Sequence, residues 1–275
     1  MLKRVSMVGR CSLAGLLAFG LAAESRATIS YSGGTYSQNF DTLATSGTAN
    51  AWVNDSTLPG WSLFQYTGGG ISTYSGGTGA SSAGNFYSFG TGTPAERALG
   101  GLGSGNTYFG SPAPATGALA GYIALALKNT NGSTLNSFTL AFAGEQWRDG
   151  GNTTAQTMAL QYGFGSTFAG VGSWSSPGGT FDYASPVNTS TAAAVDGNVA
   201  GKVNGLGGTV SSLSWLNNET LWIRWIEKND VGNDHGLAID DLTFSATAVP
   251  EASTWIAGLG LTLGMLGSFV RKYRK

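Results

Sequence analysis

Short runs of branched and aromatic residues, separated by glycine-rich segments, constrain the fold of this chain more than any other feature. Ile123, Leu125 and Leu127 lie on one side of an extended run, because successive strand residues point to opposite faces. Similar runs predict strands at 60–66, 123–127, 138–142, 158–164, 221–226 and 237–244. No long helical periodicity appears before residue 249. The sequence therefore predicts an all-β fold, an antiparallel two-sheet sandwich of jelly-roll type.

Glycine-rich segments between these runs predict the turns. The Asn-Gly pair within Asn129–Ser133 predicts a tight hairpin that makes 123–127 and 138–142 neighbouring strands. Residues 67–83 are rich in Gly, Ser and Thr and predict a loop, either mobile or ligand-binding. Gly-Gly-Thr occurs four times at uneven spacing, which indicates turns and not a regular repeat; the copies begin at Gly33, Gly76, Gly178 and Gly207.

The first 27 residues have the pattern of a secretory signal peptide. Cations at Lys3, Arg4 and Arg10 precede an apolar run at 13–23, and Ser25-Arg26-Ala27 supplies small residues at the spacing that signal peptidase needs. We therefore expect residues 1–27 to be removed. The single cysteine, Cys11, lies in this segment, so disulfides and cysteine-ligated zinc are not expected in the mature protein.

The last 27 residues, 249–275, have three parts. Val249, Pro250 and Glu251 precede an uncharged run, and we expect one transmembrane helix at 253–270. The sixteen residues from 255 to 270 give a helix of roughly 24 Å, which spans a ~30 Å hydrocarbon core only barely. The cations of the final segment 271–275 should stay in the cytoplasm and leave everything upstream on the far side; they are Arg271, Lys272, Arg274 and Lys275.

This tail resembles the PEP-CTERM sorting signal of Gram-negative bacteria that make exopolysaccharide. It departs from that signal at Ala252, where the family usually has a second proline. The resemblance implies transient residence in the inner membrane and cleavage near Pro250-Glu251 by an exosortase, a membrane cysteine protease. It further implies release to the cell surface or extracellular matrix. A plain stop-transfer anchor is the alternative.

Residues 28–248 are expected to form one domain, since 221 residues can build a sizeable core. Six cations and thirteen anions give this part a net charge of −7. An acidic domain without a basic stripe is not expected to bind nucleic acid. The chain contains no nucleotide-binding glycine motif and no Gly-x-Ser-x-Gly hydrolase motif.

Two adjacent aspartates lie in the last expected strand. Asp240 and Asp241 should point to opposite faces, so one carboxylate should point inward. An inward carboxylate needs a cation, a metal ion or several N–H donors, because an unpaired buried charge is costly. Hydrogen bonds from a loop, or a pair with Arg148 or Arg224, would satisfy this need without a metal.

The two ends of the domain resemble extracellular jelly-roll modules of the MAM and carbohydrate-binding type. The matching residues are Asn-Phe-Asp at 39–41 and Ile-Asp-Asp at 239–241. In such modules the first and last strands lie together and sometimes share a structural calcium ion. The resemblance implies that Asp41 lies near Asp240 and that calcium, which takes oxygen ligands, is a candidate cofactor there.

Glu145, Trp147 and Arg148 place a carboxylate, an indole and a guanidinium together after the run 138–142. These groups suit a sugar, with an aromatic face for the ring and polar groups for hydroxyls. They suit equally well a salt bridge beside a packed tryptophan, which we favour. A glycosidase would need a second carboxylate, for which Glu227 or Asp240 are candidates. The single histidine, His235, is expected to be a hydrogen-bonded surface group.

These observations favour an exported, non-enzymatic surface or matrix protein that binds or organises exopolysaccharide. Its expected partners are signal peptidase, the exosortase-type protease, the inner membrane and polysaccharide. Two other functions remain open. One is a secreted hydrolase of glycans or esters that uses Glu145, His235 or Asp240, and the other is a permanently anchored, adhesive ectodomain.

Overall fold

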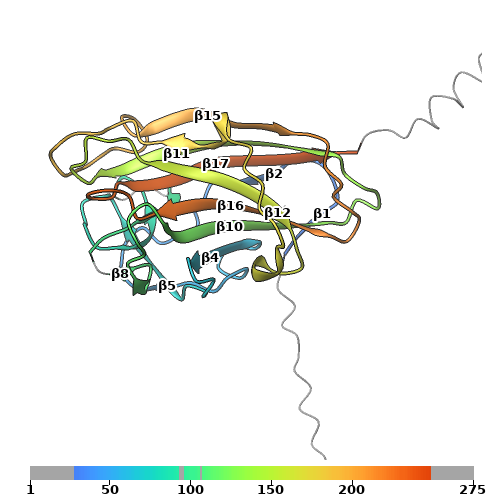
Figure 1. Ribbon diagram of the computed structural model, residues 1–275, viewed down its shortest axis with the longest axis horizontal. Coiled ribbons are helices and arrows are strands. Elements are labelled where there is room, and N and C mark those ends of the chain that lie inside the picture. Colours follow the sequence, from blue (N-terminus) through green and yellow to red (C-terminus); the bar gives the residue numbers. More distant parts are fainter. Residues whose placement is uncertain (1–27, 93–95, 106, 249–275) are drawn as a thin grey trace, which may run out of the picture.

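Two β-sheets packed face to face form the body of the molecule (Figure 1). The computed structural model describes residues 28–92, 96–105 and 107–248. The six-stranded sheet runs in the order β1-β10-β16-β12-β13, with β4 also paired to β10. Its strands are β1 (Ile29–Tyr31), β4 (Trp61–Gln65), β10 (Leu119–Asn129), β12 (Thr157–Phe164), β13 (Tyr183–Ala184) and β16 (Thr220–Lys228).

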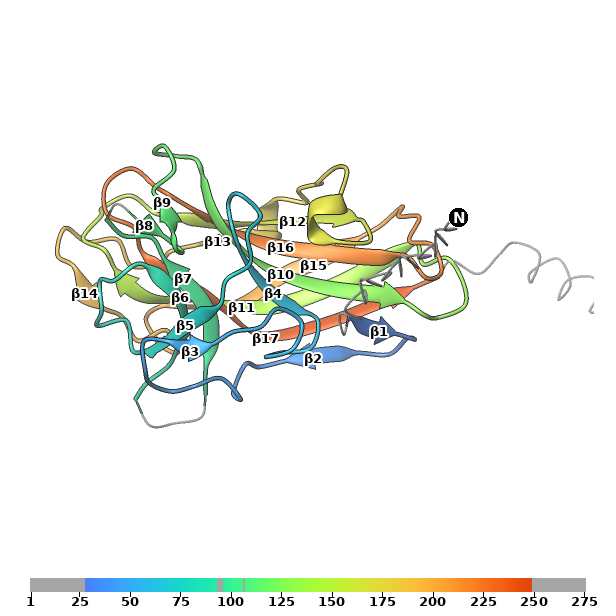
Figure 2. The same ribbon diagram turned by 90° about the horizontal axis from the view of Figure 1, so that it is seen from below.

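The nine-stranded sheet runs in the order β14-β11-β17-β7-β6-β5-β3, with β15 paired to β11 and β2 paired to β17. Its strands are β2 (Tyr36–Gln38), β3 (Asn50–Ala51), β5 (Thr73–Gly77), β6 (Asn85–Phe89), β7 (Ala98–Leu102), β11 (Ser137–Asp149), β14 (Ala193–Ala194), β15 (Lys202–Val210) and β17 (Gly236–Thr247). A two-stranded ribbon, β8 (Thr107–Tyr108) and β9 (Ser111–Pro112), and two short 3₁₀ helices, η1 (Phe168–Gly170) and η2 (Gly179–Phe181), complete the elements. Figure 2 shows β3, β5, β6 and β7 together at one end of the sandwich.

The core lies between the sheets and is rich in aromatic residues. Trp61 of β4 and Trp225 of β16 stack with ring centroids 5.8 Å apart, and Phe142 of β11 meets Trp225 edge to face from the other sheet at 5.6 Å. Burial of such large apolar surfaces is the main favourable term in folding. The predicted all-β, two-sheet sandwich is confirmed, and each of the six predicted strands overlaps an observed one.

The predicted hairpin at Asn129–Ser133 is wrong. Strands β10 and β11 on either side of it belong to different sheets, so the segment crosses from one layer to the other. The Asn129 amide donates to the carbonyl oxygens of Ser133 and Trp215 and holds this connection. The alternating apolar residues of β10 and β11 therefore face each other across the core. A period-two pattern is the same for two strands paired in one hairpin and for two strands in opposite sheets, so the pattern alone could not tell these arrangements apart.

Two other glycine-rich predictions differ from the structure. The expected loop at 67–83 contains β5, whose Tyr74 is buried in the core. The expected turn at Gly207 lies inside β15, where its φ is +105°. A Cβ at Gly207 would overlap the carbonyl oxygen of Leu140 on β11. Glycine here permits close contact between two strand backbones.

The expected signal peptide and the expected sorting tail, including Pro250 and Glu251, lie outside the described residues. Within the described part, no helix is both long enough and apolar enough to cross a membrane.

Candidate functional site

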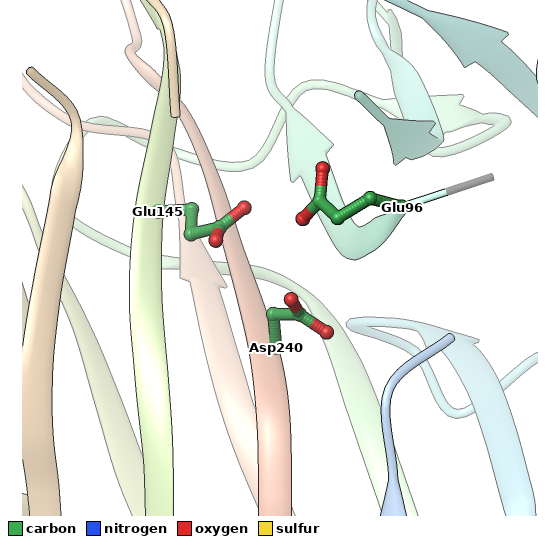
Figure 3. Close-up of side chains that lie close together, drawn as sticks. All are labelled: Glu96, Glu145 and Asp240. Atoms are coloured by element: carbon green, nitrogen blue, oxygen red, sulfur yellow. The ribbon is translucent and has the colours of Figure 1, made fainter. Parts of the chain in front are cut away.

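Three carboxylates from distant parts of the sequence converge beside the nine-stranded sheet. Glu145 and Asp240 lie on the adjacent strands β11 and β17, and Glu96 lies two residues before the start of β7. Figure 3 shows the three side chains directed toward one another. One oxygen of each lies within 4.8 Å of the other two. We call this group the carboxylate cluster.

A β-bulge explains how the strands bring these acids together. The pairing of β11 with β17 shifts register after Ala141, so that Ala143 pairs with Asp240. Residues 143 and 145 share a face of β11, which places Glu145 beside Asp240. Asp240 is only 2% exposed, whereas the Asp241 side chain is 61% exposed. One of the two aspartates is buried, as expected, but it faces away from the core between the sheets: Ile239 and Leu242 belong to that core, whereas Ala238, on the face of Asp240, packs with Trp147 and Phe89.

Neighbouring side chains donate hydrogen bonds to two acids of the carboxylate cluster, and Lys202 forms an ion pair with one of them. The Asn198 amide donates to Glu96 Oε2 at 2.6 Å, and the Trp147 indole donates to Glu145 Oε2 at 3.0 Å. Lys202 Nζ lies 3.1 Å from Glu145 Oε1 and forms a second ion pair, 3.2 Å long, with the exposed Asp241. Two carboxylates are thus oriented by donors outside the cluster, as in a preorganised ligand set.

Burial dominates the electrostatics of the cluster. It raises the pKa of Glu145 to about 7, although Lys202 and the Trp147 indole oppose the shift. Burial likewise raises the pKa of Asp240 to about 8; the backbone N–H of Asp241 opposes this shift, and the charges of Glu145 and Glu96 add to it. Glu145 and Asp240 therefore resist ionisation near neutral pH unless a cation joins them.

Asp41, the expected partner of Asp240, is not a member of this group. One of its carboxylate oxygens accepts from the backbone N–H of Arg97 and the other from the Asn39 amide. Asp41 therefore holds the segment that carries Glu96. Neither arginine considered as a partner for Asp240 bonds to it: Arg148 donates to the carbonyl oxygen of Gly79, and Arg224 donates to Gln161.

Trp147 does not present a sugar-binding surface. Its side chain is 1% exposed, its ring stacks on Phe89, and Gly197 packs so closely that a Cβ there would overlap the indole. Glu145 beside it is fully buried. These contacts match the packed tryptophan that the sequence offered as the other interpretation of this segment.

An open groove with a volume of about 1220 Å³ lies at one end of the six-stranded sheet. The loop after β4 and the segment that leads from β12 into η1 form its walls, and hydroxyl, amide and backbone groups line most of it. Its lining includes Asn54, Phe64, Lys128, Thr167, Phe168 and Asn218. This groove was not predicted from the sequence, because its residues come from distant segments and none of them forms a motif.

An aromatic layer supports the groove. Phe64 and Phe168 stack with centroids 4.1 Å apart, and Phe168 also contacts Trp222 edge to face. The Arg224 guanidinium lies 3.8 Å from the ring centroid of Trp174 and 4.5 Å from that of Tyr122. These contacts fix the outer face of the sheet beneath the groove.

Further ionisable groups are buried at the end of the sandwich near β8. His235 is 2% exposed, and its Nδ1 accepts from the backbone N–H of Gly150, so the expected surface position is wrong. Burial raises the pKa of Asp234 to about 7 and raises that of Glu227 well above its ordinary value, with the charge of Asp234 adding to the latter shift.

No protein-family model and no curated protein matches this sequence. Among solved structures, the CBM22-1 xylan-binding domain of Xyn10C from Paenibacillus barcinonensis aligns with a TM-score of 0.37 and 10% identity, over 82% of this chain and 100% of that domain. An arabinose-bound α-L-arabinofuranosidase, MgGH51, aligns with a TM-score of 0.35 and 10% identity, over 78% of this chain but 27% of the enzyme. At these TM-scores neither likeness assigns a ligand or an activity.

Proposed function

We propose that this chain is an exported, non-enzymatic surface or matrix protein whose jelly-roll-like sandwich binds polysaccharide in the groove of the six-stranded sheet. The observation that carries the binding proposal is the groove itself, open to solvent and about 1220 Å³ in volume. Export and delivery rest on the expected signal peptide and on the tail that resembles a PEP-CTERM signal.

The lining of the groove suits a neutral or weakly charged glycan. Sugar hydroxyls need many hydrogen-bonding groups at short intervals, and Ser166, Thr167, Asn218 and Thr220 provide such groups along the lining. Phe168 at the same surface adds apolar contact for the carbon face of a ring. An open site of this kind admits an internal segment of a polymer.

The distribution of acids favours binding over hydrolysis. A glycosidase normally needs two carboxylates that flank the scissile bond. Among the described residues that line the groove, Glu219 supplies a carboxylate, and one of its oxygens accepts from the backbone N–H of Leu216. The acids considered for a hydrolase, Glu145 and Asp240, are buried at another place in the fold.

Affinity electrophoresis of the purified protein through gels that contain a soluble glycan tests this function. A panel of neutral and acidic polysaccharides should include at least one that retards the wild type. Ser166→Trp should weaken this retardation at least tenfold, because Ser166 is exposed on the groove wall and an indole there would fill the groove.

Ser211→Trp is the matched control, because Ser211 is exposed but lies outside the groove lining. It should bind like the wild type. If both variants lose glycan binding equally, or if Ser166→Trp binds the glycan as well as the wild type, the groove is not the binding site. Release of reducing sugar or ester cleavage by the wild type would favour the hydrolase instead.

A further inference from the structure

The carboxylate cluster contains oxygen atoms whose bonding is incomplete. Glu96 Oε1, Glu145 Oε1 and Asp240 Oδ1 are each buried without a hydrogen-bond partner among the described residues. Glu145 Oε1 is nevertheless paired with Lys202, whose Nζ lies 3.1 Å away, so Glu96 Oε1 and Asp240 Oδ1 are the oxygens of the cluster that lack any partner among the described residues. Buried carboxylate oxygens are costly when unsatisfied. Asp240 is the clearest case, because it is 2% exposed and lies beside two other acids.

The second oxygen of Glu96 and of Glu145 is held by a fixed donor outside the cluster. Glu96 and Glu145 each use the other oxygen, Oε2, to accept from a fixed donor, Asn198 and Trp147 respectively. Glu145 Oε1 faces Lys202, whereas Glu96 Oε1 has no partner among the described residues. Asp240 Oδ1 likewise has none, and a cation between the three acids would satisfy both oxygens.

We propose that Glu96, Glu145 and Asp240 bind one calcium ion. Ligand oxygens on opposite sides of Ca²⁺ lie about 4.6–5.2 Å apart, since each bond is about 2.3–2.6 Å long, and the three oxygens here lie within 4.8 Å of one another. Three ionised carboxylates carry a charge of −3, and Lys202, which is shared between Glu145 and Asp241, offsets only part of it, so a divalent cation would offset most of the remainder.

Oxygen-only ligands select a hard cation, and the enclosure of the site favours calcium over magnesium. Mg²⁺ gives up its water reluctantly and keeps several water ligands, whereas Ca²⁺ accepts a shell made mainly of protein oxygens. Glu145 and Asp240 are 0% and 2% exposed, so solvent does not reach the ion from their side.

The bound ion would join segments that are far apart in sequence. Glu96 leads into β7, Glu145 belongs to β11 and Asp240 belongs to β17. Asn198 and Lys202, which contact the acids, lie at the end of the β14–β15 connection and the start of β15. Calcium would therefore stabilise this side of the nine-stranded sheet and would act at a distance from the groove, so its loss need not abolish glycan binding.

Terbium luminescence and thermal melting of the full-length protein, purified in detergent and stripped with EDTA, test the proposal. Tb³⁺ replaces Ca²⁺ in oxygen-rich sites and emits when a tryptophan nearby is excited; Trp147 bonds directly to Glu145. We expect sensitised emission that saturates at one equivalent and that Ca²⁺ reverses. We also expect Ca²⁺ to raise the melting temperature by several degrees, with a smaller effect of Mg²⁺.

Glu96→Gln and Asp240→Asn should each remove the emission and the Ca²⁺-dependent shift while the protein still melts cooperatively in EDTA. Glu219→Gln is the matched control, because Glu219 lies outside the cluster and lines the groove of the six-stranded sheet, and it should keep both responses. If Asp240→Asn does not fold, the Glu96→Gln variant and the number of ions bound by the wild type decide the test. Absence of saturable emission in the wild type, or an equal response in Glu96→Gln, would overturn the proposal.

Discussion

Asp240 and Asp241 are neighbours in sequence, yet the first is buried and the second is exposed. The backbone at Asp241 has φ = +50°, a left-handed conformation that aspartate and asparagine tolerate better than most residues. That conformation occurs at the bulge, so the outward direction of Asp241 and the inward direction of Asp240 have one local cause. Asp241 in turn holds Lys202, which pairs with Glu145 in the cluster.

The pKa of Asp234 predicts a pH dependence of stability. Its value in the fold, about 7, lies above its ordinary value of 3.8, because burial disfavours the charged form. The folded state therefore keeps a proton that the unfolded chain releases between these two values. The stability that Asp234 contributes is complete below about pH 3.8 and is lost as the pH rises through about 7.

Asp234→Asn removes this titration, and denaturant unfolding in EDTA between pH 3 and 8 measures the effect. Below the ordinary aspartate pKa, the difference in unfolding free energy between variant and wild type should be constant. Above it the difference should shift in favour of the variant by up to about 1.4 kcal/mol per pH unit, and it should level off above about pH 7. An unchanged difference across the whole range would contradict the assignment.

Some of the site residues could be predicted from local sequence, and others could not. Strand alternation was enough to predict that one of the two aspartates is buried, and the need of a buried charge for a partner suggested a metal near Asp240. Alternation also put Asp240 on the face of Leu242 and Phe244, which is wrong because the bulge lies between them. Glu96 was missed because it is adjacent to Arg97 in sequence, and nothing local shows that its carboxylate faces β11. The packed position of Trp147 was the favoured interpretation, but Phe89 and Gly197, which cover the indole, come from distant segments and could not be named from local sequence.

At the level of strands, apolar alternation located the elements but not their pairing. Residues 138–142 begin β11, which continues to Asp149 and pairs with β14, β15 and β17. Strand β15 was not predicted, because its sequence Lys-Val-Asn-Gly-Leu-Gly-Gly-Thr-Val contains three glycines. In this strand glycine permits contact with β11, so a residue type that usually indicates a turn is instead required by the sheet.

Replacement of Gly207 by alanine should destabilise the pairing of β15 with β11. The new Cβ would overlap the Leu140 carbonyl oxygen, and φ = +105° is unfavourable for any residue with a side chain. We expect a loss of about 1–3 kcal/mol in unfolding free energy from backbone strain alone, measured by urea denaturation.

Gly172→Ala is the control for this variant. A Cβ at Gly172 would meet no atom within 4 Å, and its φ is not positive. It should change the unfolding free energy by less than about 0.5 kcal/mol. If the Gly207→Ala protein is as stable as this control, then β15 can shift relative to β11 without a loss of unfolding free energy, and the observed register is not needed for stability.

At the level of the whole molecule, the sandwich places its last strand in a central position. Strand β17 pairs with β11, β7 and β2, and it contributes Leu242 and Phe244 to the core. Its final pair joins Thr247 to Ser137 at the start of β11. The folded domain therefore depends on β17 up to Thr247, only a few residues before the Pro250-Glu251 motif.

This arrangement makes a prediction about processing. Cleavage near Glu251 would leave every strand of the sandwich intact, so the mature and full-length proteins should have the same melting temperature. Mass spectrometry of the protein recovered from the cell surface or the medium should find a C-terminus near Glu251. A chain that still ends in Arg274-Lys275 would contradict cleavage and favour the permanent anchor. A truncation that ends at Ile239 is the matched control: it removes Leu242 and Phe244 from the core, and it should not fold even if cleavage near Glu251 is harmless.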